Sequence, residues 1–348
     1  MTTLDLSNII LTEQIPSWLW NLPKLQRLVL SFNQLHGPIP PQLYNLSSSL
    51  KEVELRDNQL HGNLPNPARS SVVGFPWELD LSMNNITSPI PQEICKMLHT
   101  SNFLSLAWNK LKGQILACIC EQKEYLEALD LSGNKLYGQF PSSFSNCSSL
   151  KVLNVENNSL EGDILVELGK LKKLQVLHIN DNKLIGHVPS SLRNCKMLEI
   201  LDLSGNNISR KVPEWIGDLS KLRVLILRSN KLEGEIPIQI RYLQKLQIPD
   251  PAMNQLSGLI PPHLSNLSTL RNGYNFTSSQ SNSAIRYANY YKEELYLTVK
   301  AQIQPYKKIL SIFTFLDLSA NNLSGDIPED MGYLKCVISF NLSHNHLV

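Results

Sequence analysis

The sequence predicts an α/β solenoid, a right-handed superhelix of about 13 repeats with a concave parallel sheet and short 3-10 or helical segments on its convex side. Two observations predict this fold. Asparagine recurs every 24 to 26 residues from Asn33 to Asn254, and again at Asn321 and Asn345. Around each asparagine, leucines keep the same phase. A unit of this length cannot bury its apolar face alone, so its copies stack and share one core.

The repeated unit is clearest at residues 222–237. Counted from Asn230 as zero, leucines occupy positions −8, −5, −3 and +2, glycine occupies +4, and Ile236-Pro237 follow at +6 and +7. The pair at −5 and −3 has a period of two, which predicts a short strand with both side chains in the core. The asparagine amide would bond backbone groups of adjacent coils, and glycine would permit a tight turn. The pattern is similar to the leucine-rich repeat signature.

The other half of each unit predicts a short helical turn. Ile216, Leu219 and Leu222 are spaced three residues apart, which is the spacing of a 3-10 helix. By this phase, residues 1–269 hold repeats 1 to 11 and the start of repeat 12, while residues 313–348 hold repeats 12 and 13, the last one truncated.

Residues 270–312 interrupt the repeats. The step from Asn254 to Asn321 exceeds one repeat by 43 residues. The inserted segment, which we call the island, begins with a polar run and continues with a tyrosine-rich, alternating run at residues 287–300. A non-repeat segment of this length is usually functional or disordered. We expect its second half to form a strand or hairpin that packs on the solenoid, with disorder as the alternative.

Composition and motifs exclude several classes of function. A net charge of +2 with 18% charged residues provides no basic surface for nucleic acid. No phosphate loop, metalloprotease motif or nucleophile elbow occurs, so we expect neither an enzyme nor a cofactor. The sequence shows no membrane span or secretion signal. Neither end carries a polar cap, so we expect a fragment of a longer protein, with a natural uncapped chain as the alternative.

The cysteines suggest one pairing. Cys95 and Cys120 each follow their asparagine by 11 residues in adjacent coils, which would place their Cα atoms about 5 to 7 Å apart. We expect either a disulfide between them or two free thiols. Cys147 and Cys195 share a phase two coils apart, about 10 Å, which predicts two buried, unpaired side chains. Cys118 and Cys120 lack a second pair of metal ligands, so no metal is expected.

Nine Asn-x-Ser/Thr sequons indicate a secreted, glycosylated protein. They are Asn45, Asn85, Asn146, Asn157, Asn207, Asn266, Asn275, Asn322 and Asn341. As an alternative, the repeat's own Asn-Asn-x-Ser/Thr pattern creates some of them as a by-product, as at Asn85, Asn207 and Asn322. Asn275 lies outside the repeat register and is the more independent sign.

The Ile-Pro ending of the repeats, as in Ile39-Pro40, resembles the plant subclass of extracellular leucine-rich repeats. An island followed by further repeats resembles plant receptor-like proteins, which are cell-surface receptors with a membrane anchor and no kinase. Islands of that family end in Tyr-x8-Lys-Gly and Lys-x5-Tyr motifs. This chain matches them at Tyr291, Lys300 and Tyr306, with Ala301 in place of the glycine.

The resemblance implies the ligand-recognition ectodomain of a receptor in immune or developmental signalling, on the extracellular side of the plasma membrane in the full-length protein. It implies that the island and the last repeats contact a leucine-rich repeat co-receptor kinase and an adaptor kinase, while earlier repeats bind a peptide or protein ligand. Two alternatives stay open. One is a secreted inhibitor of cell-wall-degrading enzymes that resembles polygalacturonase-inhibiting proteins, which have cysteine-paired caps and no island. The other is a receptor kinase ectodomain.

Ligand contacts are predicted at positions −6, −4, −2 and −1, which face the concave surface. Most repeats place Asp, Ser and Gly or Ala there, so departures are the candidate ligand-binding residues, each with a neutral surface role as its alternative. They are Arg27, Val29, Phe32, Glu54, Arg56, Asp57, Trp108, Glu156, His178, Asn180, Asp181, Ile226 and Arg228. Phe32, Trp108 and Ile226 would be exposed without a core role. We expect charge reversal at Arg228 to weaken ligand binding and leave thermal stability unchanged.

One repeat conflicts with the pattern. Pro249 and Pro251 stand where the inward leucines of repeat 11 belong. Each removes core volume and an amide donor from a parallel sheet, so we expect the weakest contact between coils here. A hinge before the island is the functional interpretation, and decay of an unselected copy is the alternative.

Overall fold

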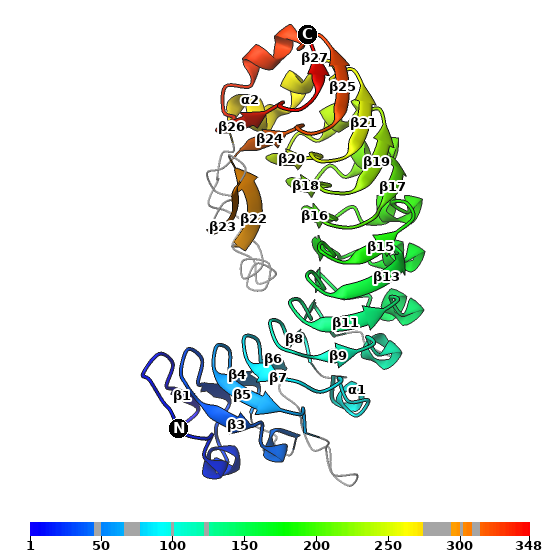
Figure 1. Cartoon of the computed structure of the whole chain (residues 1–348). Coiled ribbons are helices and arrows are strands. Elements are labelled where there is room, and N and C mark those ends of the chain that lie inside the picture. The colour runs from blue at the N-terminus through cyan, green and yellow to red at the C-terminus, as the bar shows by residue number, and fades with distance from the viewer. Residues whose placement is uncertain are drawn as a thin grey trace. The chain divides into compact units, whose positions relative to one another are not determined.

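The described coils confirm the predicted α/β solenoid. The computed structural model divides into two compact units, Met1–Glu161 and Gly162–Val348. Within each unit, the main strand of each coil pairs in parallel with the main strand of a neighbouring coil, and short helices lie on the opposite side of the coils (Figure 1). The structure describes residues 1–44, 50–65, 77–98, 101–121, 125–273, 294–299, 302–307 and 314–348.

In the first unit, the main strands pair in chain order, with Arg27 opposite Glu52 and Glu52 opposite Glu78. These strands are β1 (Thr3–Asp5), β2 (Arg27–Val29), β4 (Glu52–Glu54), β6 (Glu78–Asp80), β8 (Phe103–Ser105), β10 (Ala128–Asp130) and β12 (Val152–Asn154). After each asparagine turn, most coils add a second short strand: β3 (His36–Pro38), β5 (Gln59–Gly62), β7 (Asn85–Ile86), β9 (Lys112–Gly113), β11 (Lys135–Gly138) and β13 (Ser159–Asp163). The helical turns are η1 (Ser17–Asn21), η2 (Pro41–Tyr44), α1 (Ile94–Met97), η4 (Ala117–Cys120) and η5 (Ser142–Asn146).

The second unit repeats this plan. Its main strands are β14 (Val176–His178), β16 (Ile200–Asp202), β18 (Val224–Ile226), β20 (Ile248–Asp250), β24 (Phe315–Asp317) and β26 (Ser339–Asn341). Its second strands are β15 (Lys183–Ile185), β17 (Ser209–Lys211), β19 (Lys231–Gly234), β21 (Gln255–Gly258), β25 (Asn322–Gly325) and β27 (His346–Leu347). Its helical turns are η6 (Val166–Lys170), η7 (Ser190–Asn194), η8 (Glu214–Asp218), η9 (Ile238–Tyr242), η10 (Leu264–Asn266), α2 (Ser268–Asn272) and η12 (Glu329–Tyr333). The predicted helical turns are therefore confirmed.

The repeat asparagines join neighbouring coils as predicted. Asn58 Oδ1 accepts the N–H of Leu35 in the preceding coil (3.0 Å), and its Nδ2 donates to the carbonyls of Leu30 (3.0 Å) and Leu55 (3.1 Å). Asn321 makes the same bonds across the inserted segment, to Leu256 N–H (3.0 Å) and to the carbonyl of Pro251 (3.1 Å). Each such bond contributes about 1 kcal/mol and satisfies a backbone group that would otherwise be buried without a partner.

The island contains the hairpin that the sequence predicts. β22 (Glu294–Val299) and β23 (Gln302–Lys307) are antiparallel, with Val299 opposite Gln302. Packing of this hairpin on the solenoid stays a prediction. Because β21 pairs directly with β25, the stack of repeats continues past the insertion.

The two prolines interrupt the contact between β20 and β24. Phe315 N–H donates to Gln247 O (3.0 Å) and Met253 N–H donates to Ser319 O (2.9 Å), so the strands lie side by side. Between these bonds, Pro249 and Pro251 have no N–H to donate, and β20 and β24 belong to separate sheets. Both prolines also line an apolar cavity of about 20 Å³. The predicted losses of core volume and amide donors are confirmed.

The pairing of Cys95 with Cys120 and the unpaired state of Cys147 were both wrongly predicted. Disulfides join Cys95 to Cys118, with Cα atoms 5.5 Å apart, and Cys120 to Cys147, with Cα atoms 5.1 Å apart. Cys118 and Cys120 are two residues apart on the short turn η4, so their side chains point in different directions. Cys118 reaches the preceding coil and Cys120 reaches the next one. An equal offset from the asparagine does not give an equal direction, and for this reason Cys95 does not pair with Cys120.

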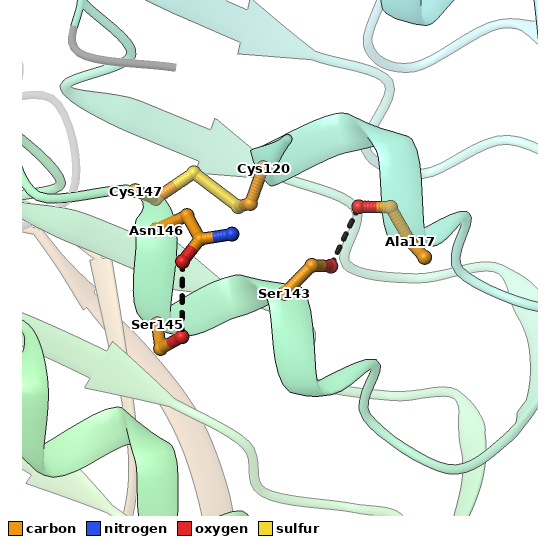
Figure 2. The surroundings of a disulfide bond; sticks show 6 residues. All are labelled: Ala117, Cys120, Ser143, Ser145, Asn146 and Cys147. Carbon is orange, nitrogen blue, oxygen red and sulfur yellow. Dashed lines mark hydrogen bonds between the residues drawn. A yellow bond between two sulfur atoms is a disulfide. The ribbon is translucent and has the colours of Figure 1, made fainter. Parts of the chain in front are cut away.

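Each disulfide links consecutive coils on the helical side. Figure 2 shows the bond between Cys120 and Cys147 together with a hydrogen bond from Ser143 Oγ to the carbonyl of Ala117 (2.6 Å), which also joins η4 to η5. Cys195 is a buried free thiol, as predicted, and its Sγ donates to the carbonyl of Leu168 (3.4 Å).

Candidate ligand-binding face

The candidate ligand-binding residues lie on the side of each main sheet that faces away from the core, the outward face. Parallel pairing aligns equal repeat positions into rows, as in the set Ile200, Val224 and Ile248. Two rows matter for function. The strand row lies four residues before each repeat asparagine, and before Ile9 in the first coil: Asp5, Val29, Glu54, Asp80, Ser105, Asp130, Asn154, His178, Asp202, Ile226, Asp250, Asp317 and Asn341. The turn row directly precedes each asparagine: Phe32, Asp57, Met83, Trp108, Gly133, Asn157, Asp181, Gly205, Ser229, Met253, Ala320 and His344.

The strand row is mostly closed to solvent. Strands lie about 4.8 Å apart, so side chains on neighbouring strands shield one another. Ile226, expected to be exposed, is only 2% exposed and lies in register between Asp202 and Asp250. Val29 and His178 are buried in the same way. The predicted exposure of Ile226 was therefore wrong.

Aspartates of the strand row have a structural role. Asp202 Oδ1 accepts the N–H (3.0 Å) and the hydroxyl (2.6 Å) of Ser204, which closes the turn after the strand. Asp80 and Asp317 accept the equivalent N–H groups. Burial raises the pKa of Asp202 to about 7, although the bonds from Ser204 oppose this shift.

His178 and Asn180 are two further buried polar residues of the outward face. Burial lowers the pKa of His178 to about 4, so the ring is uncharged at neutral pH. Its Nδ1 lies 4.0 Å from Asp202 Oδ2. Within the described residues, His178 Nδ1 and Asn180 Oδ1 have no hydrogen-bond partner. Asn180 Nδ2 donates to Asp181 Oδ2 (2.9 Å), and Asp181 itself is exposed.

The turn row is where large side chains reach solvent. Phe32 is 51% exposed and Trp108 is 42% exposed, as predicted for both. Met83 occupies the same row and is also exposed, but it was missed among the sequence candidates. Most repeats place Asp, Ser and Gly or Ala at the outward positions, and Met83, like Trp108, replaces the last of these. An alignment of the repeats therefore already indicates Met83 as a candidate.

The charged candidates of the first unit are partly paired. Arg27 Nε lies 2.9 Å from Glu52 Oε1, and its Nη2 lies 2.8 Å from Glu54 Oε1. Arg56 Nη1 donates to Ser82 Oγ (3.4 Å). Arg27, Glu54, Arg56 and Glu156 are all half-buried, so these side chains remain partly accessible on the outward face.

Arg228 has a structural role that the sequence did not reveal. Its Nε lies 3.1 Å from Asp250 Oδ2, and its Nη2 lies 2.7 Å from Asp317 Oδ2. Both carboxyl groups are almost fully buried, so Arg228 joins β18, β20 and β24 through two shielded ion pairs. The expectation that charge reversal at Arg228 leaves stability unchanged is therefore corrected. Asp250 and Asp317 occupy the same repeat position. Aligning the repeats across the island would have indicated that Arg228 can reach both carboxyl groups.

The sequons and island motifs are only partly described. Sequon asparagines that are exposed are Asn146, Asn157, Asn207, Asn266 and Asn322, and those that are half-buried are Asn85 and Asn341. Asn45, Asn275, Tyr291 and Lys300 lie outside the described residues, and the backbone of Tyr306 belongs to β23. In the part of the chain that the structure describes, no group of three or more His, Cys, Asp or Glu is placed to hold a metal ion.

Comparison with known proteins identifies the repeat. The family described as leucine-rich repeat region matches residues 131–272, and the family described as Leucine Rich Repeat matches residues 24–46, 77–97 and 313–334. The chain belongs to the leucine-rich repeat family. No helix among the described residues has the length and apolar composition needed to cross a membrane.

The leucine-rich repeat chain is similar to plant receptors. Receptor-like protein 32 of Arabidopsis thaliana is 36% identical over 182 residues, which cover 50% of this chain and 20% of that protein. The chain thus spans about one fifth of that relative's length. These matches confirm the resemblance to plant receptor-like ectodomains.

Solved ectodomains share the fold. The plant peptide hormone receptor RGFR1 in complex with RGF2 has a TM-score of 0.79 and 28% identity, covering 99% of this chain and 48% of that chain. The Arabidopsis receptor kinase HAESA, in complex with the peptide hormone IDA and the co-receptor SERK1, has a TM-score of 0.58 and 25% identity, covering 100% of this chain and 62% of that chain.

Proposed function

We propose that this chain is the ligand-recognition part of the ectodomain of a plant receptor-like protein, at the extracellular side of the plasma membrane in the full-length protein. The observation that carries the proposal is the turn row, which presents exposed aromatic side chains on an outward face whose strand row is closed. Aromatic side chains are common energetic anchors in binding surfaces. Two disulfides support an oxidising, extracellular compartment.

The ligand in this proposal is a peptide or protein segment that lies along the outward face. The RGFR1 and HAESA structures, whose complexes contain peptide hormones, support this class of ligand. Accessible candidates make the contacts: Arg27, Phe32, Glu54, Arg56, Asp57, Trp108, Glu156 and Asp181. Val29, His178, Asn180 and Ile226 act from beneath, by holding neighbouring side chains in place.

The co-receptor contact in this proposal lies at the island and the repeats after it, with Tyr291, Lys300 and Tyr306 as its candidate residues. SERK1 in the HAESA complex supports a co-receptor kinase as the partner class. Contact with an adaptor kinase rests on the family resemblance alone. An inhibitor of cell-wall-degrading enzymes is less well supported, because the disulfides here join internal coils and the chain has an island hairpin.

The proposal is tested by ligand-dependent assembly. The 348-residue chain, secreted from insect cells and immobilised, is exposed to pools of short synthetic peptides and then to the purified ectodomain of a leucine-rich repeat co-receptor kinase. We expect co-receptor binding that depends on a peptide pool. If folded chain, verified by circular dichroism, binds no peptide pool, the proposed function is wrong. If a pool binds and the co-receptor does not, only the co-receptor part is wrong.

A further inference from the structure

The turn row of the first unit holds bulky side chains in a backbone conformation that disfavours them. Phe32, Met83 and Trp108 have φ values of 58°, 55° and 51°. This left-handed region is unfavourable for residues with a Cβ and uncommon for large side chains. Gly133 and Gly205 occupy the same position in other repeats, so glycine satisfies the fold here. Backbone strain of this kind is typical of functional sites.

These three side chains lie along the turn row, with Asp57 between Phe32 and Met83, and we call Phe32, Met83 and Trp108 together the apolar ridge. Their exposed fractions are 51%, 38% and 42%. Met83 and Trp108 lie on adjacent coils, joined by the bond from Met83 N–H to Ala107 O (2.9 Å). A Cβ built on Gly133 would lie 2.6 Å from Trp108 Cδ2, so the indole lies directly against this glycine of the next coil. The absence of a side chain at Gly133 leaves room for the indole ring.

Carboxyl groups outnumber basic groups beside the ridge. The outward positions of β2, β4 and β6 and of the turns that follow them hold five carboxyl groups and two guanidinium groups: Glu52, Glu54, Asp57, Glu78, Asp80, Arg27 and Arg56. Arg27 is already shared between Glu52 and Glu54. Burial raises the pKa of Glu52 to about 7, and the adjacent Glu54 and Glu78 contribute to this shift. This surface therefore favours additional positive charge.

We propose that the apolar ridge and the carboxyl groups beside it bind an extended peptide segment that carries one large apolar side chain and one basic side chain. This inference rests on the proposed function and names the chemistry of its ligand. The apolar side chain lies against Trp108 and Met83, and the basic side chain lies near Asp57. Asp57 and Trp108 are two coils apart, about 10 Å, which corresponds to about three residues of extended peptide. The ligand motif is therefore a basic residue about three positions from an apolar one.

Substitution by glycine gives the sharpest test. Because glycine is the unstrained residue at this position, Trp108→Gly and Met83→Gly remove the side chain without disturbing the turn. Met253→Gly is the matched control, since Met253 lies in the turn row of the second unit, has a φ of 54° and is 52% exposed. Binding of fluorescent synthetic peptides to the full chain is measured by anisotropy, with basic–apolar, acidic–apolar, basic-only and apolar-only pools. Thermal unfolding of each variant is recorded in parallel.

We expect the basic–apolar pool to bind at least about tenfold more tightly than the acidic–apolar pool. Trp108→Gly should weaken that binding by about tenfold or more, Met83→Gly by less, and Met253→Gly not at all, all with unchanged or higher unfolding temperatures. Equal binding of basic and acidic pools, or unchanged affinity in Trp108→Gly, overturns the proposal while the proposed function stands. Failure of all pools overturns both.

A second copy of this chain could occupy the apolar ridge in place of a peptide, and a sedimentation experiment distinguishes the two. Sedimentation of the chain and of Trp108→Gly reports self-association. A dimer that Trp108→Gly abolishes would assign the ridge to self-association and overturn the peptide proposal. A monomer at all concentrations supports it.

Discussion

Two contacts between coils in the second unit use equivalent repeat positions but are held in different ways. Between β16 and β18, Leu203 fills the core, and its N–H donates to Ile226 O (2.9 Å). Between β20 and β24, Pro251 stands at the equivalent position without an N–H, next to a cavity of about 20 Å³. The second contact instead has Arg228, whose guanidinium bridges Asp250 and Asp317. Neighbouring coils can therefore stack without some of the backbone hydrogen bonds between their strands, where buried ion pairs join the same strands.

The largest expected effect comes from copying the broken contact into the regular one. Leu203→Pro removes the bond to Ile226 O and a fully buried leucine, so we expect the free energy of unfolding to fall by more than about 3 kcal/mol. Urea unfolding followed by circular dichroism measures this change. Leu203→Ala is the control, because it removes core volume and keeps the N–H. If the proline variant is no less stable than the alanine variant, the lost donor is unimportant in this sheet.

Reversing the charge of Arg228 should have the next largest effect. Arg228→Glu leaves two buried carboxyl groups unpaired and adds a third, so we expect a loss of about 3 to 5 kcal/mol in the free energy of unfolding. Arg193→Glu is the matched control, because the ion pair of Arg193 with Asp218 is largely exposed, and it should change stability by less than about 1 kcal/mol. If the two substitutions lower the free energy of unfolding equally, the ion pairs of Arg228 do not stabilise this contact.

The features that the sequence predicts are those that one repeat encodes. The asparagine period fixes which leucines face the core and where the helical turns lie, while the bounds of the insertion stay a prediction. The loss of backbone hydrogen bonds between β20 and β24 can also be predicted from the sequence, because Pro249 and Pro251 have no N–H to donate in any strand. The disulfide partners of Cys118 and Cys120 did not follow, since side-chain direction on a short turn decides them.

Properties shared between coils were also beyond sequence reasoning. The burial of Ile226 and His178 depends on how closely neighbouring strands pack, and the role of Arg228 depends on a partner, Asp317, that lies after the island. The ion pair of Arg228 with Asp317 can be expected only after the repeats are aligned across that insertion. Met83 differs from these cases, because a methionine in place of the common glycine can be recognised in the sequence of the repeat alone.

Repairing the broken contact should have a smaller and opposite effect. The double variant Pro249→Leu/Pro251→Leu restores two N–H donors facing β24 and fills the cavity, so we expect a gain of about 1 to 2 kcal/mol in the free energy of unfolding. Amide exchange of residues 314–348 should slow in parallel, because opening at this contact becomes less frequent. The corresponding double alanine variant restores the donors without filling the cavity and separates the two contributions. Unchanged exchange in the leucine variant would contradict a weak contact here.

The strand-row aspartates of the two contacts, Asp202 and Asp250, should also differ in how they make stability depend on pH. Asp250 faces Arg228, whereas Asp202 faces His178, which is uncharged at neutral pH. Burial raises the pKa of Asp202 from 3.8 to about 7, so between these values the folded state holds a proton that the unfolded chain releases. The contribution of Asp202 to stability is therefore fully present below about pH 4 and declines as pH rises towards about 7.

Asp202→Asn should remove that decline, because the amide stays neutral and still accepts the turn N–H, as Asn154 does from Glu156 (3.1 Å). We expect the variant to match the natural chain near pH 4 and to be more stable than it near pH 8 in urea unfolding. Burial also raises the pKa of Asp250 to about 7, although Arg228 opposes that shift. Because Asp250→Asn also removes one ion pair of Arg228, its gain near pH 8 should be smaller than that of Asp202→Asn. If both variants respond alike, the guanidinium does not distinguish the two contacts, and burial alone governs the strand row.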